Sequence, residues 1–311
     1  MTANLQNPIF TDEPKAREWL EARVWPNGPV CPHCGATGDD VTALNGKAHR
    51  PGLYQCSQCR EQFTVTVKTV FERSKIPLTK WLAALFLLTS SKKGVSAHQV
   101  HRSLGISYKS SWFMMHRLRE ALRSDPKGQL GGPGKIVESD ETFFVNRKGF
   151  KRQVGVGHKM AVMSLVERVG PIRSVVLDRV TRPAVEKIIR RNVHHDSKLM
   201  TDTAGYYRGR RFGIPDHEMV NHDAGDYAFG DVHVNTLEGY YSIFKRGMKG
   251  VYQHCSEQHL HRYVSEFDFR YNTRTRLGFN DLMRAEKAAE GIKGKRLTYR
   301  RPVKLTQSPA N

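Results

Sequence analysis

Acidic side chains stand out in the second half of the chain because two of them interrupt apolar runs. Asp140 lies in "VESDETFFV", with Glu138 two residues before it on the same face of a strand, and Asp202 ends the run "KLMTD". A carboxylate in such a strand needs a partner or a metal to offset its desolvation. Glu238 follows in "HVNTLEGYYSIFKRGMKG". We interpret these acids as candidate metal ligands.

The chemistry of such a site follows from its ligands and from the charge of the chain. Oxygen ligands suit Mg²⁺ or Mn²⁺, and two such ions about 4 Å apart can hold the attacking and leaving oxygens of a phosphoryl transfer. The 311 residues include 50 Lys and Arg against 30 Asp and Glu, a net charge of +20. This excess favours a polyanionic partner, of which nucleic acid is the commonest, and the partner we expect is double-stranded DNA.

Membrane and secreted classes are not expected. No apolar run reaches the roughly 18 residues of a membrane span, and the first ten residues lack the apolar core of a signal peptide. We therefore expect a cytoplasmic, nucleoid-associated protein with no membrane partner.

A second metal site is indicated near the N-terminus. "CPHC" and "CSQC" place Cys31, Cys34, Cys56 and Cys59 in two pairs separated by 21 residues. Four thiolates at tetrahedral corners suit one structural Zn²⁺ and leave no position for a substrate. His33 and His49 are expected to be bystanders, and the unpaired Cys255 a small core residue.

The segment from 233 to 250 separates into two stripes at helical spacing. Its polar stripe consists of Asn235, Glu238, Ser242, Lys245 and Lys249, and its apolar stripe of Leu237, Tyr240, Tyr241, Phe244 and Met248. Residues three, four or seven apart share one face of a helix. The apolar stripe is therefore expected to dock on a sheet, with the polar stripe facing the metals.

Strand and helix patterns alternate around the acids. β-rich runs at 135–145, 159–168 and 172–180 precede an amphipathic helix at 182–193 and a short strand at 198–202. Another helix is expected at 257–274. This order predicts a mixed α/β domain.

The first part of the chain reads as helical apart from the cysteine region. A helix is expected at 11–24, and three more at 77–94, 96–104 and 107–124. The last two, joined by the tight turn "LGIS", have helix-turn-helix character, which favours DNA binding. An ordinary three-helix bundle is the alternative.

Together these patterns divide the chain into six parts. They are an N-terminal helical lead-in (1–27), a zinc ribbon (28–74), a helix-turn-helix-like DNA-binding segment (75–126), a Gly/Pro linker (127–135), a catalytic α/β domain (136–285) and a basic C-terminal tail (286–311).

The order of these motifs resembles bacterial insertion-sequence transposases of the DDE class, in the group with an N-terminal zinc ribbon and an ISXO2-like transposase domain. Besides the cysteines, the motifs that carry the resemblance are "SDETF", "MTDTAGYY", "HVNTLEGYYSIFKRGMKGVY" and "HLHRYVSEFDFRYN". It extends from about Asp12 to Asp281. The resemblance implies a ribonuclease-H-like catalytic domain in which three acidic residues bind two Mg²⁺ ions.

Carried over by motif, the first two of these acids are Asp140 and Asp202. The third is Glu238, separated from Asp202 by 35 residues, or Asn235, separated from it by 32. A carboxylate neutralises a divalent ion better than an amide does, which favours Glu238 as the ligand and Asn235 as an auxiliary one. Lys245 follows at the position where such enzymes often carry a DNA-contacting base.

The remaining polar residues near the motifs have less specific interpretations. Glu141 is expected to meet an Arg or Lys, Glu138 to be at most a spare ligand, and His233 to contact a phosphate or water. Tyr206 and Tyr207 are either core residues or base-stacking ones. Basic residues that flank the motifs are candidates for phosphate contacts: Lys245, Arg246, Lys249, Arg208, Arg210, Lys148 and Lys109.

The function these features favour is a DNA transposase that cuts element ends and joins the freed 3′-hydroxyls to target DNA by two-metal phosphoryl transfer. Two ends must be brought together, so a homo-oligomeric synaptic complex is expected. Two alternatives stay open: an inactive or repurposed zinc-ribbon DNA-binding protein, and a metal-dependent nuclease without strand transfer.

Overall fold

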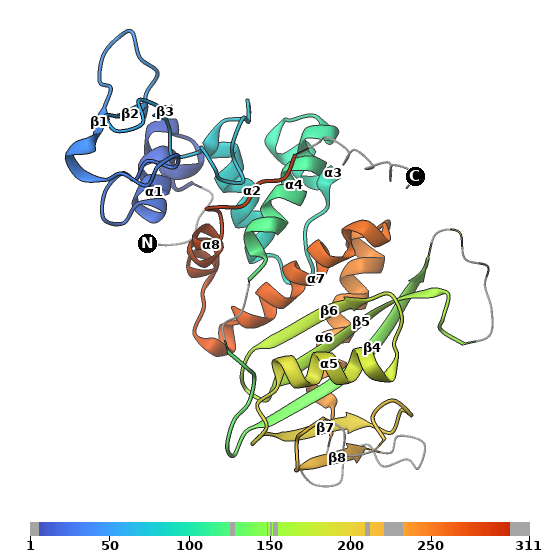
Figure 1. Ribbon diagram of the computed structural model, residues 1–311. Coiled ribbons are helices and arrows are strands. Elements are labelled where there is room, and N and C mark those ends of the chain that lie inside the picture. The colour runs from blue at the N-terminus through green and yellow to red at the C-terminus, as the bar shows by residue number, and fades with distance from the viewer. Residues whose placement is uncertain are drawn as a thin grey trace, which may run out of the picture.

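The computed structural model of the chain describes residues 6–124, 128–147, 149, 151, 155–208, 212–220 and 233–298. Figure 1 shows a helical body that carries three short strands, next to a larger sheet with helices on its faces. The candidate residues Lys148 and Arg210 lie outside the described part of the chain.

The helical body contains the zinc-ribbon region and is built around one hydrophobic core. Its elements are η1 (Pro8–Phe10), α1 (Glu13–Val24), η2 (Gly38–Asp40), β1 (Val41–Ala43), β2 (Tyr54–Cys56), β3 (Gln62–Phe63), α2 (Leu78–Ser90), α3 (Ala97–Leu104), α4 (Tyr108–Leu122) and α8 (Asp281–Glu290). Strands β1, β2 and β3 form an antiparallel sheet in that order. The core joins the ribbon to the helices, since Phe63 and Cys56 belong to the same buried cluster as Leu20 and Leu85.

Helices α1, α3 and α4 begin and end within two residues of the expected positions, whereas α2 ends at Ser90, four residues before its expected end. The side chain of Asp12 accepts a hydrogen bond from the backbone of Lys15 and caps α1. Ser96 caps α3, which ends at Gly105 in the left-handed conformation, and Ser107 caps α4. Two helices joined by a three-residue turn are therefore present in the region expected to bind DNA.

Helix α8 brings the end of the described chain back to the helical body. It packs against α1, α2 and α4, and its Ala288 and Ala289 are buried in the N-terminal core together with Ile292. Residues 286 to 290 are therefore part of a packed helix, whereas the sequence interpretation started a basic tail at 286. Small alanine side chains allow this close packing, but they leave only a weak apolar signal in the sequence.

The larger sheet has five strands in the order β6-β5-β4-β7-β8. They are β4 (Ile136–Asn146), β5 (Lys159–Glu167), β6 (Ile172–Leu177), β7 (Lys198–Asp202) and β8 (His217–Val220). The first three pair antiparallel, whereas β4 with β7 and β7 with β8 pair parallel. Four of these strands match the expected runs, and β8 is an edge strand that was not predicted because its four residues carry almost no apolar pattern.

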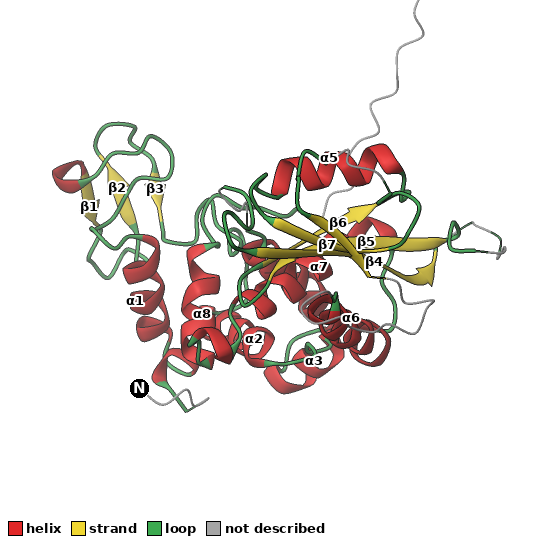
Figure 2. Ribbon diagram, turned by 90° about the horizontal axis from the view of Figure 1, so that it is seen from below, coloured by secondary structure: helices red, strands yellow, loops and turns green. Residues whose placement is uncertain are grey.

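Helices cover both faces of this sheet, as Figure 2 shows, with α5 on one face and α6 and α7 on the other. The elements are α5 (Arg182–Asn192), α6 (Asn235–Gly247) with its π-helical continuation η4 (Met248–Tyr252), α7 (Glu257–Asn272) and η5 (Thr275–Leu277). One core contains Leu237, Phe244 and Phe267, and the other contains Val185, Ile189 and Tyr207. The mixed α/β class expected from the sequence is confirmed.

The Gly/Pro segment before β4 is packed along the sheet in its described part. Leu130 is 1% exposed and exchanges backbone hydrogen bonds with Asn192 and His194. Gly131 has φ +85°, and a Cβ there would lie 2.1 Å from the Ser197 hydroxyl. Residues 128 to 135 thus belong structurally to the sheet domain, although their composition indicated a linker.

A buried ion pair connects the two bodies where α4 packs on α7. Arg119 donates to Glu266 over 2.5 Å, and their side chains are 3% and 0% exposed. Glu266 also accepts from Arg270 and Tyr252. The adjacent cations hold the pKa of Glu266 below its usual range, although its burial acts in the opposite direction.

Candidate active site and zinc-binding cluster

Asp140 and Asp202 end up side by side because of the register between two parallel strands. Ile136 to Ser139 of β4 pair with Lys198 to Thr201 of β7 in sequence order. The next residue of each strand is Asp140 or Asp202, so the two carboxylates lie on the same face of the sheet, where β7 ends and β4 continues to Asn146. The two acids expected from the motifs are therefore neighbours.

Helix α6 crosses this face and presents the polar stripe. Leu237, Tyr240, Tyr241 and Phe244 are buried, as is Met248, whereas Asn235, Glu238, Ser242 and Lys249 are exposed and Lys245 is partly buried. The hydroxyl of Tyr241 donates to the backbone carbonyl of Asp140 over 2.6 Å. The two stripes expected from the sequence are confirmed, and one hydrogen bond fixes the helix against the acidic strand.

The electrostatics of Asp140 show which charges surround it. Burial raises the pKa of its carboxyl to about 7, with the negative charges of Asp202 and Glu238 acting in the same direction. The N–H of Glu141, which donates over 2.7 Å, and the charge of Lys245 act in the opposite direction. Asp140 thus lies within electrostatic range of both other acids and of the stripe lysine.

The carboxylates of Asp140, Asp202 and Glu238 interact electrostatically, but they do not form a compact ligand cluster. Within the described ranges, ligand atoms lie within 4.8 Å of one another in only two sets of three or more: the four cysteines and the exposed group His194, His195 and Asp196. Asp140, Asp202 and Glu238 do not form such a set, so their carboxylate oxygens do not all lie within 4.8 Å of one another.

Glu138 anchors the helix that carries the third candidate ligand. Its carboxylate is fully buried and accepts from the backbone N–H groups of Thr236 (3.0 Å) and Leu237 (3.2 Å). It also pairs with Arg168 over 2.8 Å, and Arg168 in turn donates to the His233 carbonyl. Both oxygens of Glu138 are used, so it positions the N-terminus of α6, where a negative charge is favoured. The spare-ligand interpretation is therefore not supported.

Glu141 lies on the opposite face from Asp140 and meets two tyrosines where an Arg or Lys was expected. Tyr206 donates to one carboxylate oxygen over 2.8 Å, and Tyr207 donates to the other and contacts the Ser139 hydroxyl. Burial raises the pKa of Glu141 to about 8, although both tyrosine hydrogen bonds act against the shift. This cluster ties the loop after Asp202 to β4, and the sequence held a signal for it in the pair "YY" four residues beyond that acid.

In the zinc-loaded protein without magnesium, whose cysteines stay ionised on the metal, the stability is expected to fall as the pH rises from about 6.5 to about 8.5. The carboxyls of Asp140 and Glu141 titrate at about 7 and about 8 when folded, but near 4 when unfolded. In this window the folded state binds more protons, so the free energy of unfolding decreases with pH, by about 1–3 kcal/mol. Burial lowers the pKa of His116 to about 2, and this opposite contribution acts only below about 6.5.

Urea denaturation at a series of pH values measures this dependence. Glu141→Gln should remove the larger part of the decline, because this carboxyl stays protonated over more of the window, and added magnesium should reduce the part that Asp140 contributes. A free energy of unfolding that rises across the window would contradict the assignment.

The candidate DNA contacts lie on the surface in the described part of the chain. Lys249, Arg208 and Lys109 are exposed, the last in the first turn of α4. Arg246 lies along α6 and donates to the hydroxyl and carbonyl of Ser242. Lys245, Arg246 and Lys249 therefore continue the stripe of Glu238 with positive charge.

The four cysteines form a possible zinc-binding site. The sulfurs of Cys31 and Cys59 are 3.6 Å apart, as are those of Cys34 and Cys56. Thiolates about 2.3 Å from a tetrahedral Zn²⁺ lie about 3.8 Å from one another, so the arrangement fits this ion. His33 and His49 are exposed and lie outside the cluster.

The backbone around the cysteines forms two matching knuckles. Gly35 N–H donates to the Cys31 carbonyl and Arg60 N–H to the Cys56 carbonyl, and both Gly35 and Arg60 have positive φ. Burial opposes ionisation of Cys31, but N–H groups of Cys34 and His33 donate to its sulfur, and its pKa is lowered to about 7. A lowered thiol pKa favours metal binding.

No helix in the described ranges is long and apolar enough to cross a membrane.

Comparison with known proteins agrees with this organisation. Residues 11–62 match the transposase zinc-ribbon domain, and residues 129–272 match the ISXO2-like transposase domain. A Halobacterium salinarum protein described as an uncharacterized protein in transposable element ISH50 is 29% identical over 280 residues, which cover 84% of this chain and 91% of that protein. The chain therefore carries a transposase zinc-ribbon domain followed by an ISXO2-like transposase domain.

Proposed function

We propose that the protein cuts DNA at the ends of an insertion sequence and joins the freed 3′-hydroxyls to target DNA. The observation that carries the proposal is the juxtaposition of Asp140, within β4, and Asp202, at the end of the parallel strand β7, with Glu238 and Lys245 of α6 close to Asp140. A mixed sheet with helices on both faces and acids at one strand edge supports a ribonuclease-H-like catalytic domain.

The donor set fits Mg²⁺ or Mn²⁺. Asp140, Asp202 and Glu238 offer hard oxygen ligands, and burial, together with the charges of Asp202 and Glu238, raises the pKa of Asp140, an effect that a cation offsets. When bound, two such ions polarise the scissile phosphate and lower the pKa of the attacking hydroxyl or water. The chain itself positions the ligands: Glu138 fixes the start of α6, Tyr241 ties this helix to Asp140, and the Glu141 cluster holds the loop after Asp202.

DNA binding is assigned to two surfaces. The zinc ribbon, stabilised by Zn²⁺ at the four cysteines, and the α3–α4 pair with Lys109 at its exposed turn are proposed to recognise the element ends. Lys245, Arg246, Lys249 and Arg208 are proposed to contact backbone phosphates near the acids. A homo-oligomer that holds two ends together completes the proposal, and the chromosomal DNA of the cytoplasm is its substrate.

A strand-transfer assay with purified protein, element-end DNA, target DNA and Mg²⁺ tests this function. Joined products are the expected result. Cleavage without joining would indicate a nuclease, and DNA binding without either reaction would indicate an inactive or repurposed binding protein.

The third ligand is tested by two separate substitutions on α6. Glu238→Ala is expected to reduce joining by at least about 100-fold, since it removes a charged metal ligand worth several kcal/mol, and Asn235→Ala by about tenfold or less. Ser242→Ala, on the same exposed stripe, is the matched control. Full joining by Glu238→Ala together with an inactive Asn235→Ala would show that the amide completes the site.

A further inference from the structure

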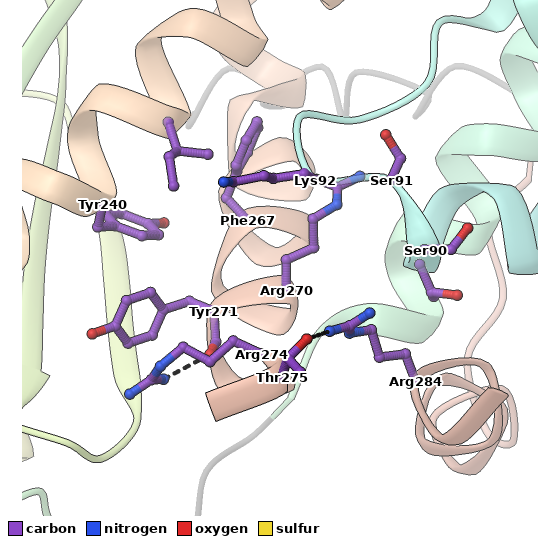
Figure 3. A pocket seen from close by; sticks show the side chains of 12 residues that line it. Ser90, Ser91, Lys92, Tyr240, Phe267, Arg270, Tyr271, Arg274, Thr275 and Arg284 are labelled. Carbon is purple, nitrogen blue, oxygen red and sulfur yellow. Dashed lines mark hydrogen bonds between the residues drawn. The ribbon is translucent and has the colours of Figure 1, made fainter. Parts of the chain in front are cut away.

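A cavity of about 430 Å³ lies among the end of α2, α6, α7 and α8, apart from the acidic edge of the sheet. Figure 3 shows Lys92, from the segment after α2, and Arg270, from α7, reaching into this region with Tyr240 of α6 beside them. Tyr240 and Ile243 line the cavity from a face of α6 other than the one that carries Glu238. The cavity is therefore distinct from the proposed metal site.

The charged residues that line the cavity are all cations: Lys92, Arg270, Arg274 and Arg284. Arg274 and Arg284 are engaged by protein acceptors, and Arg270 is engaged through one of its nitrogens. Arg284 pairs with Asp281 and donates to the Thr273 carbonyl, and Arg274 donates to the carbonyls of Tyr271 and Gly170. Among the described residues, no acidic side chain lines this space.

Arg270 carries the strongest indication of a ligand. Its side chain is 9% exposed, and its Nη2 donates to Glu266 and to the Leu88 carbonyl. Its Nε and Nη1 are buried without a hydrogen-bond partner in the described structure. Two buried donors without acceptors cost about 1–3 kcal/mol each, a penalty that the oxygens of an anion remove. Lys92 is exposed and forms no ion pair within the described ranges, so it is available to the same anion.

The remaining walls of the cavity are apolar and aromatic. Tyr240 and Tyr271 meet edge to face with ring centroids 5.7 Å apart, and Phe267 lies beside them in the lining. Aromatic walls favour a flat ring, and a volume of 430 Å³ suits a small ligand or one unit of a polymer. The required ligand therefore combines an anion with a flat ring.

We propose that this cavity binds one nucleotide, with its phosphate on Arg270 and Lys92 and its base against Tyr240 and Tyr271. The nucleotide is either one unit of a bound DNA strand or a free nucleotide. The first of these two sources rests on the proposed function. Lys92 provides the test because it is exposed and its loss leaves the core intact, while its exposed neighbour Lys93 does not line the cavity and serves as the control.

The experiment is a calorimetric titration of the full-length protein with thymidine monophosphate at low salt. Lys92→Gln is expected to weaken binding about tenfold, because a charge-assisted contact is lost, and Lys93→Gln to leave it unchanged. Arg270→Lys keeps the charge beside Glu266 but loses the planar donors, and it should weaken binding as well. The proposal is overturned if the wild type does not bind, if Lys92→Gln binds as the wild type does, or if both lysine variants lose affinity equally.

A competition arm identifies the source of the nucleotide. Displacement of bound thymidine monophosphate by duplex DNA supports a DNA unit as the ligand, whereas continued binding at saturating DNA supports a free nucleotide. Neither measurement requires cleavage or joining. If the protein binds the nucleotide but forms no joined products, the nucleotide pocket is therefore supported and the proposed function is not.

Discussion

Asp140→Asn is expected to reduce strand transfer by about 1,000-fold or more, because the loss of a metal-ligating carboxylate removes several kcal/mol of transition-state stabilisation. The same substitution should make the metal-free protein more stable. Burial and the charges of Asp202 and Glu238 raise the pKa of Asp140 to about 7, so its ionised form opposes folding at pH 8. The amide lacks this charge, and we expect a gain of about 1–2 kcal/mol in the free energy of unfolding at that pH.

Joining assays and urea denaturation, performed on the same preparations, measure the two effects. Asp216→Asn is the matched control because it makes the same change at an exposed aspartate before β8. A variant that is both inactive and less stable would instead show that Asp140 has a structural role, and a fully active variant would remove it from the site.

Cys34→Ser is expected to release zinc and to weaken the binding of element-end DNA by about 100-fold. Structural zinc contributes its binding energy to folding, so a ribbon with three thiolates loses its fixed geometry. Its packing partners are affected too, since Cys56 and Phe63 share a core with α1 and α2. The sheet domain has cores of its own and should keep its far-ultraviolet signal.

Cys255→Ser provides the control for the cysteine chemistry. Cys255 lies in the segment before α7, and its sulfur contacts only the Ser256 carbonyl among the described hydrogen bonds. This variant should retain one zinc per chain and wild-type DNA affinity, measured by a chromogenic chelator and by fluorescence anisotropy. If Cys34→Ser and Cys255→Ser bound DNA with equal affinity, recognition of the element ends would not depend on the zinc ribbon.

Local patterns were sufficient to predict most of the fold. The strands β4 to β7, the helices α1 to α7 and the two stripes of α6 were all expected from local apolar runs, periodicity and the capping or turn residues that bound them. The adjacency of Asp140 and Asp202 was suggested by their motifs, but it became explicit only through the register of β4 and β7. Register depends on pairing between segments about 60 residues apart, which periodicity within one strand does not specify.

The features that could not be predicted depend on long-range contacts. Glu138 contacts the start of α6 across 98 residues, so its role as an anchor leaves no local signature. Glu141 was expected to pair with a cation. Its carboxylate is instead buried beside Tyr206 and Tyr207, whose hydroxyls donate hydrogen bonds to it. Helix α8 is rich in charge and alanine, and only its packing against α2 distinguishes it from a solvated tail.

The central claim is that Asp140, Asp202 and Glu238 hold divalent metal ions, and counting bound Mn²⁺ by electron paramagnetic resonance tests it most directly. The zinc-loaded wild-type protein is predicted to bind at least one Mn²⁺ per chain, with affinity that falls as the pH decreases through about 7 because protons compete at Asp140. Asp140→Asn and Asp202→Asn are predicted to lose this ion, while Asp216→Asn retains it. Equal Mn²⁺ binding by the wild type and by both site variants would contradict the account.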